Sequence, residues 1–231
     1  MKVIEEEFVV LWLIYESMGQ NLGEMSSIGV IIIGILIGVG HVFEIDHVIA
    51  VTNLVNQKEN IQSWKIGLSW GIGHSITTAV IGILFIIFDI KISENFSNVG
   101  EVAVGITLIY LGLKGIVFDE RINNHIHKYG SEYGHLNPMQ KKEDWSPKSL
   151  MIGIIHGVAG TGFLIILLVA TSNDVVGGSL IIISFCGTII ILMSIIGHFW
   201  DKIQKIHRKN IGKISAMAGI IAGVLLIVNH V

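Results

Sequence analysis

Charged residues are scarce in this chain of 231 residues: only 14% are Asp, Glu, Lys or Arg, whereas 52% are hydrophobic. A soluble domain carries about 25% charged residues, so this chain has too little polar surface for a water-soluble fold of its length. The same composition excludes disordered, collagen-like and coiled-coil chains. The net charge of −3 is small and gives no indication of a nucleic-acid partner.

Cysteine, proline and several enzyme motifs are also missing or rare. The single cysteine, Cys186, lies in an apolar run and has no partner for an internal disulfide. The sequence contains no G-x-x-x-x-G-K-[ST] loop and no H-E-x-x-H motif, which disfavours an ATP hydrolase and a zincin-type protease. Only two residues are proline, whereas 27 are glycine. Glycine in apolar helices permits close helix packing in a membrane.

Six apolar segments are long enough to cross a bilayer, since a spanning helix needs about 20 apolar residues. They are apolar all round, unlike the alternating strands of a membrane barrel. The shorter run Phe8–Tyr15 is interpreted as an interfacial or packed helix, with a remnant spanning segment as the alternative. The sequence therefore predicts an all-α polytopic membrane protein with about six transmembrane helices, over Ile28–Val51, Trp64–Phe88, Val99–Val117, Leu150–Ala170, Val175–Phe199 and Ile214–Val231.

The distribution of lysine and arginine predicts the orientation of these helices. With six spans, every such residue except Lys2 and Lys91 falls on one side. Basic loops remain in the cytoplasm, so both termini are expected outside a cell membrane. The chain then divides into a first three-helix half (1–118), a cytoplasmic loop (119–148) and a second three-helix half (149–231). Because three is odd, the halves would be inverted repeats, as in many transporters.

The cytoplasmic loop contains histidines that have two interpretations. His125 and His127 are spaced so that they could share a metal ion. The loop has no dense histidine run, however, and a plain polar linker is the alternative.

Four ionisable residues are concentrated in the first predicted span, within "GHVFEIDHVIAVTN". A charged residue at the centre of a membrane helix costs about 2.5–3.5 kcal/mol on insertion scales, so such residues usually have a function. His41, Glu44, Asp46 and His47 are all of metal-ligand types. The alternative is an ion-pair network that only locks helices together.

Helical spacing separates these four residues. At about 100° per residue, His41, Glu44 and His47 form one stripe, while Asp46 lies about 100° outside it. In a regular helix, Glu44 is therefore expected to contact an ion directly. Asp46 is expected to orient a histidine or face a neighbouring helix, unless nearby glycines distort the backbone.

Two further histidines are predicted to lie at the same membrane depths as His41 and Glu44. With a rise of about 1.5 Å per residue, His41 and His74 both lie about 15 Å from the cytoplasmic ends of their spans, while Glu44 and His156 lie one turn lower. Each pair is expected to meet near the midplane, where transporter sites lie. The predicted metal site comprises His41, Glu44, Asp46, His47, His74 and His156, with Ser75, Asn53 and Thr161 as supporting donors and Gly34, Gly38 and Gly73 as packing positions.

The pattern His41-x4-Asp46-His47 resembles the signature of the nickel/cobalt permease family, which has roughly the form H-A-x-D-A-D-H-I. Asn53 matches the downstream asparagine of that family, and Gly73-His74-Ser75 is similar to its Gly-His motif.

The stretch "HGVAGTG", which begins at His156, resembles the urease-accessory transporter-like branch of the same superfamily. Glu44 stands where the family usually has Asp, a later acidic motif is missing, and six spans replace the usual eight. These departures fit the shorter branch better than the main one.

The resemblance implies uptake of Ni²⁺, or alternatively Co²⁺, as a transported ion with no permanently bound cofactor and no enzymatic reaction. The implied partners are the metal ion and the lipid bilayer, while a metallochaperone or urease-maturation partner stays unidentified. The alternative is an intramembrane zinc-dependent hydrolase. In that case His41, His74 and His156 would hold zinc, and Glu44 or Asp46 would act as the base.

The predicted orientation can be tested by labelling introduced cysteines with membrane-impermeant reagents. Asn137→Cys should react only from the cytoplasmic side, and Ser172→Cys only from outside, because an odd number of spans separates them. Labelling of both positions from the same side would contradict the six-span topology.

Overall fold

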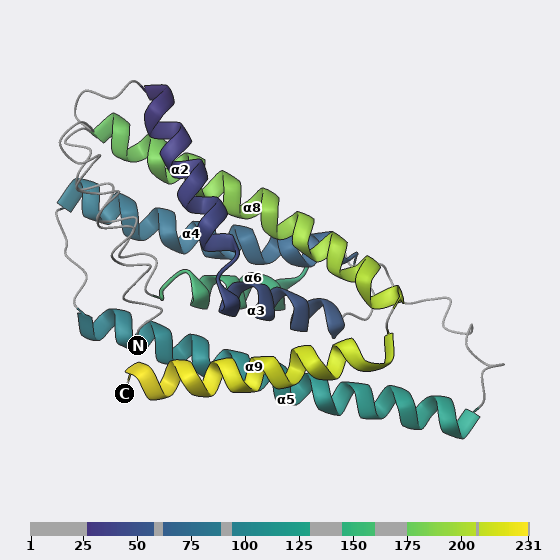
Figure 1. Cartoon of the computed structure of the whole chain (residues 1–231). Helices are drawn as coiled ribbons and strands as arrows, with labels where there is room; N and C mark the ends of the chain where they lie inside the picture. Colours follow the sequence, from purple (N-terminus) through teal and green to yellow (C-terminus); the bar gives the residue numbers. More distant parts are fainter. Residues whose placement is uncertain are drawn as a thin grey trace.

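The computed structural model describes residues 27–57, 62–88, 94–129, 145–159, 175–206 and 208–230. All regular secondary structure within these ranges is helical (Figure 1). The helices are α2 (Ser27–Val42), α3 (Ile45–Asn56), α4 (Ser63–Phe88), α5 (Glu94–Tyr129), α6 (Pro147–His156), α8 (Val175–Ile206) and α9 (Arg208–His230).

Four of these helices contain segments that are long and apolar enough to cross a membrane: Ser63–Phe88, Ser97–Val117, Val175–Ile203 and Ile211–His230. Helices α2 and α3 pass the same test together but are bent by 63° at the break between them. The described part of the chain thus has four or five candidate spans, and the protein is a polytopic membrane protein. Many large apolar side chains on the helices are exposed, as contact with lipid requires.

The first predicted span, Ile28–Val51, is not the continuous helix that the sequence analysis assumes. The last turn of α2 closes with short-range bonds, from Phe43 N to Gly40 O (3.2 Å) and from Glu44 N to His41 O (3.1 Å). Glu44 then adopts an extended backbone (φ −58°, ψ 141°) before α3 begins. The stripe derived for a regular helix therefore does not hold across Glu44.

The other predicted spans differ from the observed helices mainly at their ends. Helices α4, α5, α8 and α9 cover the second, third, fifth and sixth predicted segments. Of the fourth, Leu150–Ala170, only residues 150–159 are described, and they contain most of α6, which Ser146 caps by accepting from Ser149 N (3.3 Å). Phe8–Tyr15 lies outside the described residues.

Helix α5 continues through residues 119–129, which belong to the predicted cytoplasmic loop. The sequence from 116 to 129 contains neither glycine nor proline, so no helix-breaking signal stops the helix there. His125 and His127 lie on this extension, beyond the residues whose side chains are described.

The two longest helix pairs, α4 with α8 and α5 with α9, run in opposite directions (Figure 1). Helix α4 packs along α8 and α5 along α9, while α2 crosses α8 and α6 lies against α4. Glycine makes these approaches close. Gly38 packs on Thr188 of α8, Gly34 on Ser184 of α8, and Gly73 on the backbone of Leu150 in α6.

Two of these helix pairs have a reciprocal contact at their crossing. Ser75 Oγ of α4 donates to Cys186 O of α8 (3.2 Å), and Cys186 Sγ donates to Ser75 O (3.6 Å). Similarly, a Cβ on Gly105 of α5 would meet the carbonyl oxygen of Gly223 in α9, and a Cβ on Gly223 would meet that of Gly105. In each pair, one residue comes from the first half of the chain and the other from the second half. Each of the two approaches the backbone carbonyl oxygen of the other.

Replacing glycine at a tight crossing should destabilise the bundle. A Cβ at Gly67 would collide with the backbone of Met193, whereas a Cβ at Gly187 would meet no atom within 4 Å. We expect Gly67→Ala to cost about 1–3 kcal/mol through overpacking. Gly187→Ala should be neutral or stabilising, because alanine favours a helix by about 1 kcal/mol over glycine.

The measurement is the temperature at which detergent-solubilised protein loses its monodisperse peak in size-exclusion chromatography. A Gly67→Ala variant as stable as Gly187→Ala would show that α4 and α8 do not approach as closely as described.

Candidate metal centre

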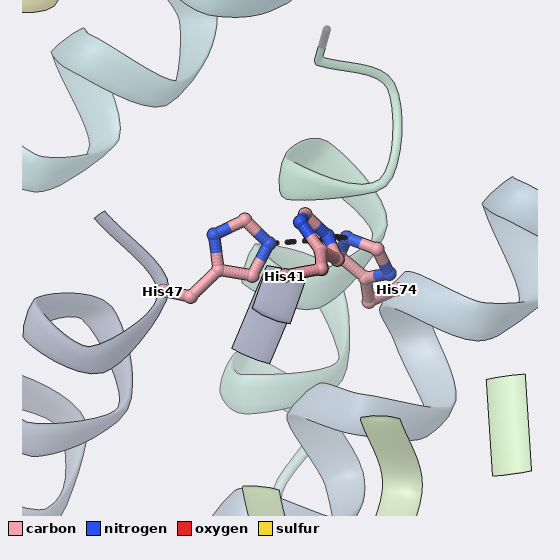
Figure 2. Close-up of side chains that lie close together, drawn as sticks. All are labelled: His41, His47 and His74. Atoms are coloured by element: carbon pink, nitrogen blue, oxygen red, sulfur yellow. Dashed lines mark hydrogen bonds between the residues drawn. The ribbon is translucent and has the colours of Figure 1, made fainter. Parts of the chain in front are cut away.

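Three buried imidazoles converge at the break between α2 and α3 (Figure 2). His41 comes from the end of α2, His47 from the start of α3 and His74 from the middle of α4. The Nε2 atom of His74 lies 3.2 Å from His41 Nε2 and 3.3 Å from His47 Nε2. All three side chains are almost completely buried. We call this group the three-imidazole site.

The spacing of these nitrogens fits one shared metal ion. Nitrogens about 2.0–2.1 Å from a divalent ion are about 2.9 Å apart at a 90° angle and about 3.3 Å apart at the tetrahedral angle. The two observed separations, 3.2 and 3.3 Å, fall within this range. One N–H···N bond could satisfy at most two of the three nitrogens, so hydrogen bonding alone leaves a buried ring nitrogen without a partner.

Carboxylates lie on the opposite edges of two of these rings. Glu44 Oε1 is 2.8 Å from His41 Nδ1, and Asp46 Oδ1 is 2.9 Å from His47 Nδ1. Neither Nδ1 atom forms an aligned hydrogen bond, so these are close charge contacts. A carboxylate offers only acceptors, which favours a proton on Nδ1 and leaves Nε2 free as a ligand.

The position of Glu44 differs from the helical-wheel expectation, because its carboxylate lies on the Nδ1 side of His41 and His47. Asp46 contacts His47 Nδ1, which is compatible with the expected role of orienting a histidine. Glu44 lies at the bend between α2 and α3, whereas Asp46 and His47 are neighbours in the first turn of α3.

His156 lies beside the three-imidazole site. Its ring centroid is 5.9 Å from that of His47. His156 Nδ1 donates to Ile152 O (2.9 Å), and since a carbonyl only accepts, the Nε2 atom carries the lone pair. That Nε2 atom is buried and has no hydrogen-bond partner. The expected meeting of His41 and His74 is therefore present, whereas His156 packs near His47 and not against Glu44.

Aromatic rings and a hydroxyl hold the imidazoles in place. Phe185 stacks on His41 (5.4 Å between centroids) and Trp70 on His74 (5.1 Å), while Thr78 Oγ1 lies 3.3 Å from His74 Nδ1. None of these three residues was predicted from the sequence to belong to the site. For Trp70 and Thr78 a signal existed, because both lie four residues from His74 and share its helix face.

The expected supporting residues have other contacts. Ser75 joins α4 to α8 through Cys186, as described above. Asn53 Nδ2 donates to Ser215 O (3.0 Å) and joins α3 to α9. Thr161 lies outside the described residues.

The sequence of this chain is similar to those of a bacterial protein and a plant protein. The chain is 33% identical over 175 residues to the urease accessory protein UreH of Bacillus sp. (strain TB-90), covering 75% of this chain and 77% of that protein. It is 26% identical over 158 residues to the chloroplast protein FOR GROWTH AND FERTILITY 1 of Arabidopsis thaliana, and spans 43% of that longer protein. No solved structure matches the chain.

A larger family is identified by a family model that matches most of the chain. The model of the family described as "Cytochrome C biogenesis protein transmembrane region" matches residues 47–225, which run from the first turn of α3 into α9. The matched residues include His47, His74 and His156, whereas His41, Glu44 and Asp46 precede them. The chain therefore belongs to the family of the cytochrome c biogenesis protein transmembrane region, and it is similar to the urease accessory protein UreH.

Proposed function

We propose that this protein carries Ni²⁺, or alternatively Co²⁺, across the cell membrane through the three-imidazole site. One observation carries the proposal: three Nε2 atoms from α2, α3 and α4 converge in the buried interior of a polytopic membrane protein. Imidazole suits both ions. The unpartnered Nε2 atom of His156, whose ring centroid lies 5.9 Å from that of His47, is a further candidate ligand beside this site.

Two resemblances support nickel as the ion. The His41-x4-Asp46-His47 pattern resembles the signature of the nickel/cobalt permeases, and the similar Bacillus protein is a urease accessory protein. Urease contains nickel, so a membrane protein that assists urease is expected to handle this metal. Copper binds more tightly than nickel to most nitrogen sites, so selectivity must come from the geometry of the site.

The helix pairing supports two inverted three-helix repeats. The reciprocal contacts Ser75–Cys186 and Gly105–Gly223 are those expected along a two-fold axis in the membrane plane. In transporters with such repeats, one half moves against the other around a central site. A membrane potential of 100 mV supplies about 2.3 kcal/mol per charge, or about 4.6 kcal/mol for a dication.

Transport and the alternative of a zinc hydrolase predict different metal behaviour. A hydrolase keeps one tightly bound zinc ion, whereas a carrier must bind its ion weakly enough to release it. We propose that the protein catalyses no reaction and that its metal exchanges. Dialysis of purified protein against metal-free buffer should therefore remove bound metal without unfolding the protein.

Removal of one imidazole from the three-imidazole site should abolish transport. We expect His74→Ala to lower ⁶³Ni uptake into proteoliposomes by more than about 100-fold, because loss of a ligand costs more than the 10–100-fold typical of outer-shell changes. His198→Ala is the matched control, since His198 is exposed on α8 away from the site. The double variant His125→Ala/His127→Ala should retain substantial uptake at saturating nickel.

These reconstituted vesicles also test the proposed function as a whole. They contain only this protein and an imposed membrane potential, with cobalt, zinc and copper as competitors. Absence of nickel and cobalt uptake by the wild-type protein, or normal uptake by His74→Ala, would overturn the proposal.

A further inference from the structure

A second group of ligand atoms adjoins the three-imidazole site and shares one of its histidines. Ligand atoms of Glu44, Asp46 and His47 lie within 4.8 Å of one another. His47 Nδ1 lies 2.9 Å from Asp46 Oδ1 and 3.8 Å from Glu44 Oε2, is buried, and has no hydrogen-bond partner. Across the same ring, His47 Nε2 faces His74. His47 therefore offers one nitrogen to each group.

The two groups differ in chemistry and in exposure. The side chain of Glu44 is 42% exposed and that of Asp46 is 17% exposed, whereas His41, His47 and His74 are buried. Two carboxylates and one nitrogen suit a cation that keeps part of its water, including oxygen-seeking ions such as Mn²⁺. Three buried nitrogens suit nickel, cobalt or zinc after the water has been lost.

We propose that Glu44, Asp46 and His47 Nδ1 form a loading station, which binds a partly hydrated divalent cation before it passes to the three-imidazole site. This inference rests on the proposed function and deepens it. The two carboxylates balance the charge of the ion while it is still hydrated. The ion then exchanges water for imidazole over a short path, from one side of the His47 ring to the other.

The shared histidine makes occupation of the two positions exclusive. A neutral imidazole has one N–H and one lone pair, so His47 can ligate through only one nitrogen at a time. With an ion at the loading station, the ring proton is on Nε2. When the ion has moved inward, the proton is on Nδ1 beside the carboxylates. The proton lost at one nitrogen is regained at the other, so the transfer releases no net proton.

The test uses full-length protein in detergent and two metals with different ligand preferences. Binding of Mn²⁺ is followed by electron paramagnetic resonance, and binding of Co²⁺ by its visible absorption. His74→Ala should retain Mn²⁺ binding with little change in affinity. The double variant Glu44→Gln/Asp46→Asn should bind Mn²⁺ at least about tenfold more weakly, while Co²⁺ still gives the spectrum of nitrogen ligation. In wild-type protein, Ni²⁺ should displace Mn²⁺.

Asp201→Asn is the matched control for loss of a carboxylate, because Asp201 lies near the C-terminal end of α8, and it should leave Mn²⁺ binding unchanged. Unchanged Mn²⁺ affinity in Glu44→Gln/Asp46→Asn, or simultaneous binding of Mn²⁺ and Ni²⁺ to the wild type, would overturn the loading station. If the binding results are as expected but vesicles take up no nickel or cobalt, the proposed transport fails and the metal-binding station still stands.

Discussion

The cost of burying ring nitrogens without partners constrains the whole candidate metal centre. A buried polar atom that lacks a hydrogen bond costs about 1–3 kcal/mol, and His41, His47, His74 and His156 all lie in the protein interior. Each ring has a close polar neighbour at its Nδ1 atom: Glu44, Asp46, Thr78 or Ile152 O. These neighbours orient the rings so that three Nε2 atoms converge, and a shared dication would satisfy all three at once.

Close helix packing makes this convergence geometrically feasible. Gly153 contacts the backbone of Trp70, and Gly157 contacts that of His74, so α6 lies almost directly on α4. On the other side, Gly38 brings α2 onto α8. Larger side chains at these positions would separate the helices, and the imidazoles could no longer meet. Glycine therefore contributes no ligand, but its lack of a side chain lets the helices approach closely enough for the imidazoles to meet.

Near the break at Glu44, the site has a partly exposed side with two carboxylates and a buried side with the imidazole Nε2 atoms. Asp46 contacts His47 within the first turn of α3, whereas Glu44 lies at the 63° bend and contacts the Nδ1 edge of His41 at the end of α2. The interrupted backbone also leaves Glu44 partly exposed while His41 and His47 stay buried. Broken helices of this kind place polar groups at membrane depth in many transporters.

Most of the architecture could be predicted from the sequence, because apolar runs are read directly from the order of residues and the rise per residue of an α-helix is constant. The apolar segments that form α4, α5, α8 and α9, and the shared depth of His41 and His74, were of this kind. Only the tertiary structure showed which ring edges the carboxylates approach, and that Ser75 and Asn53 join helices instead of supporting the site. A helical wheel assumes one regular backbone, whereas the contact of Glu44 with His41 spans a bend, and the contacts of Ser75 and Asn53 are made with other helices.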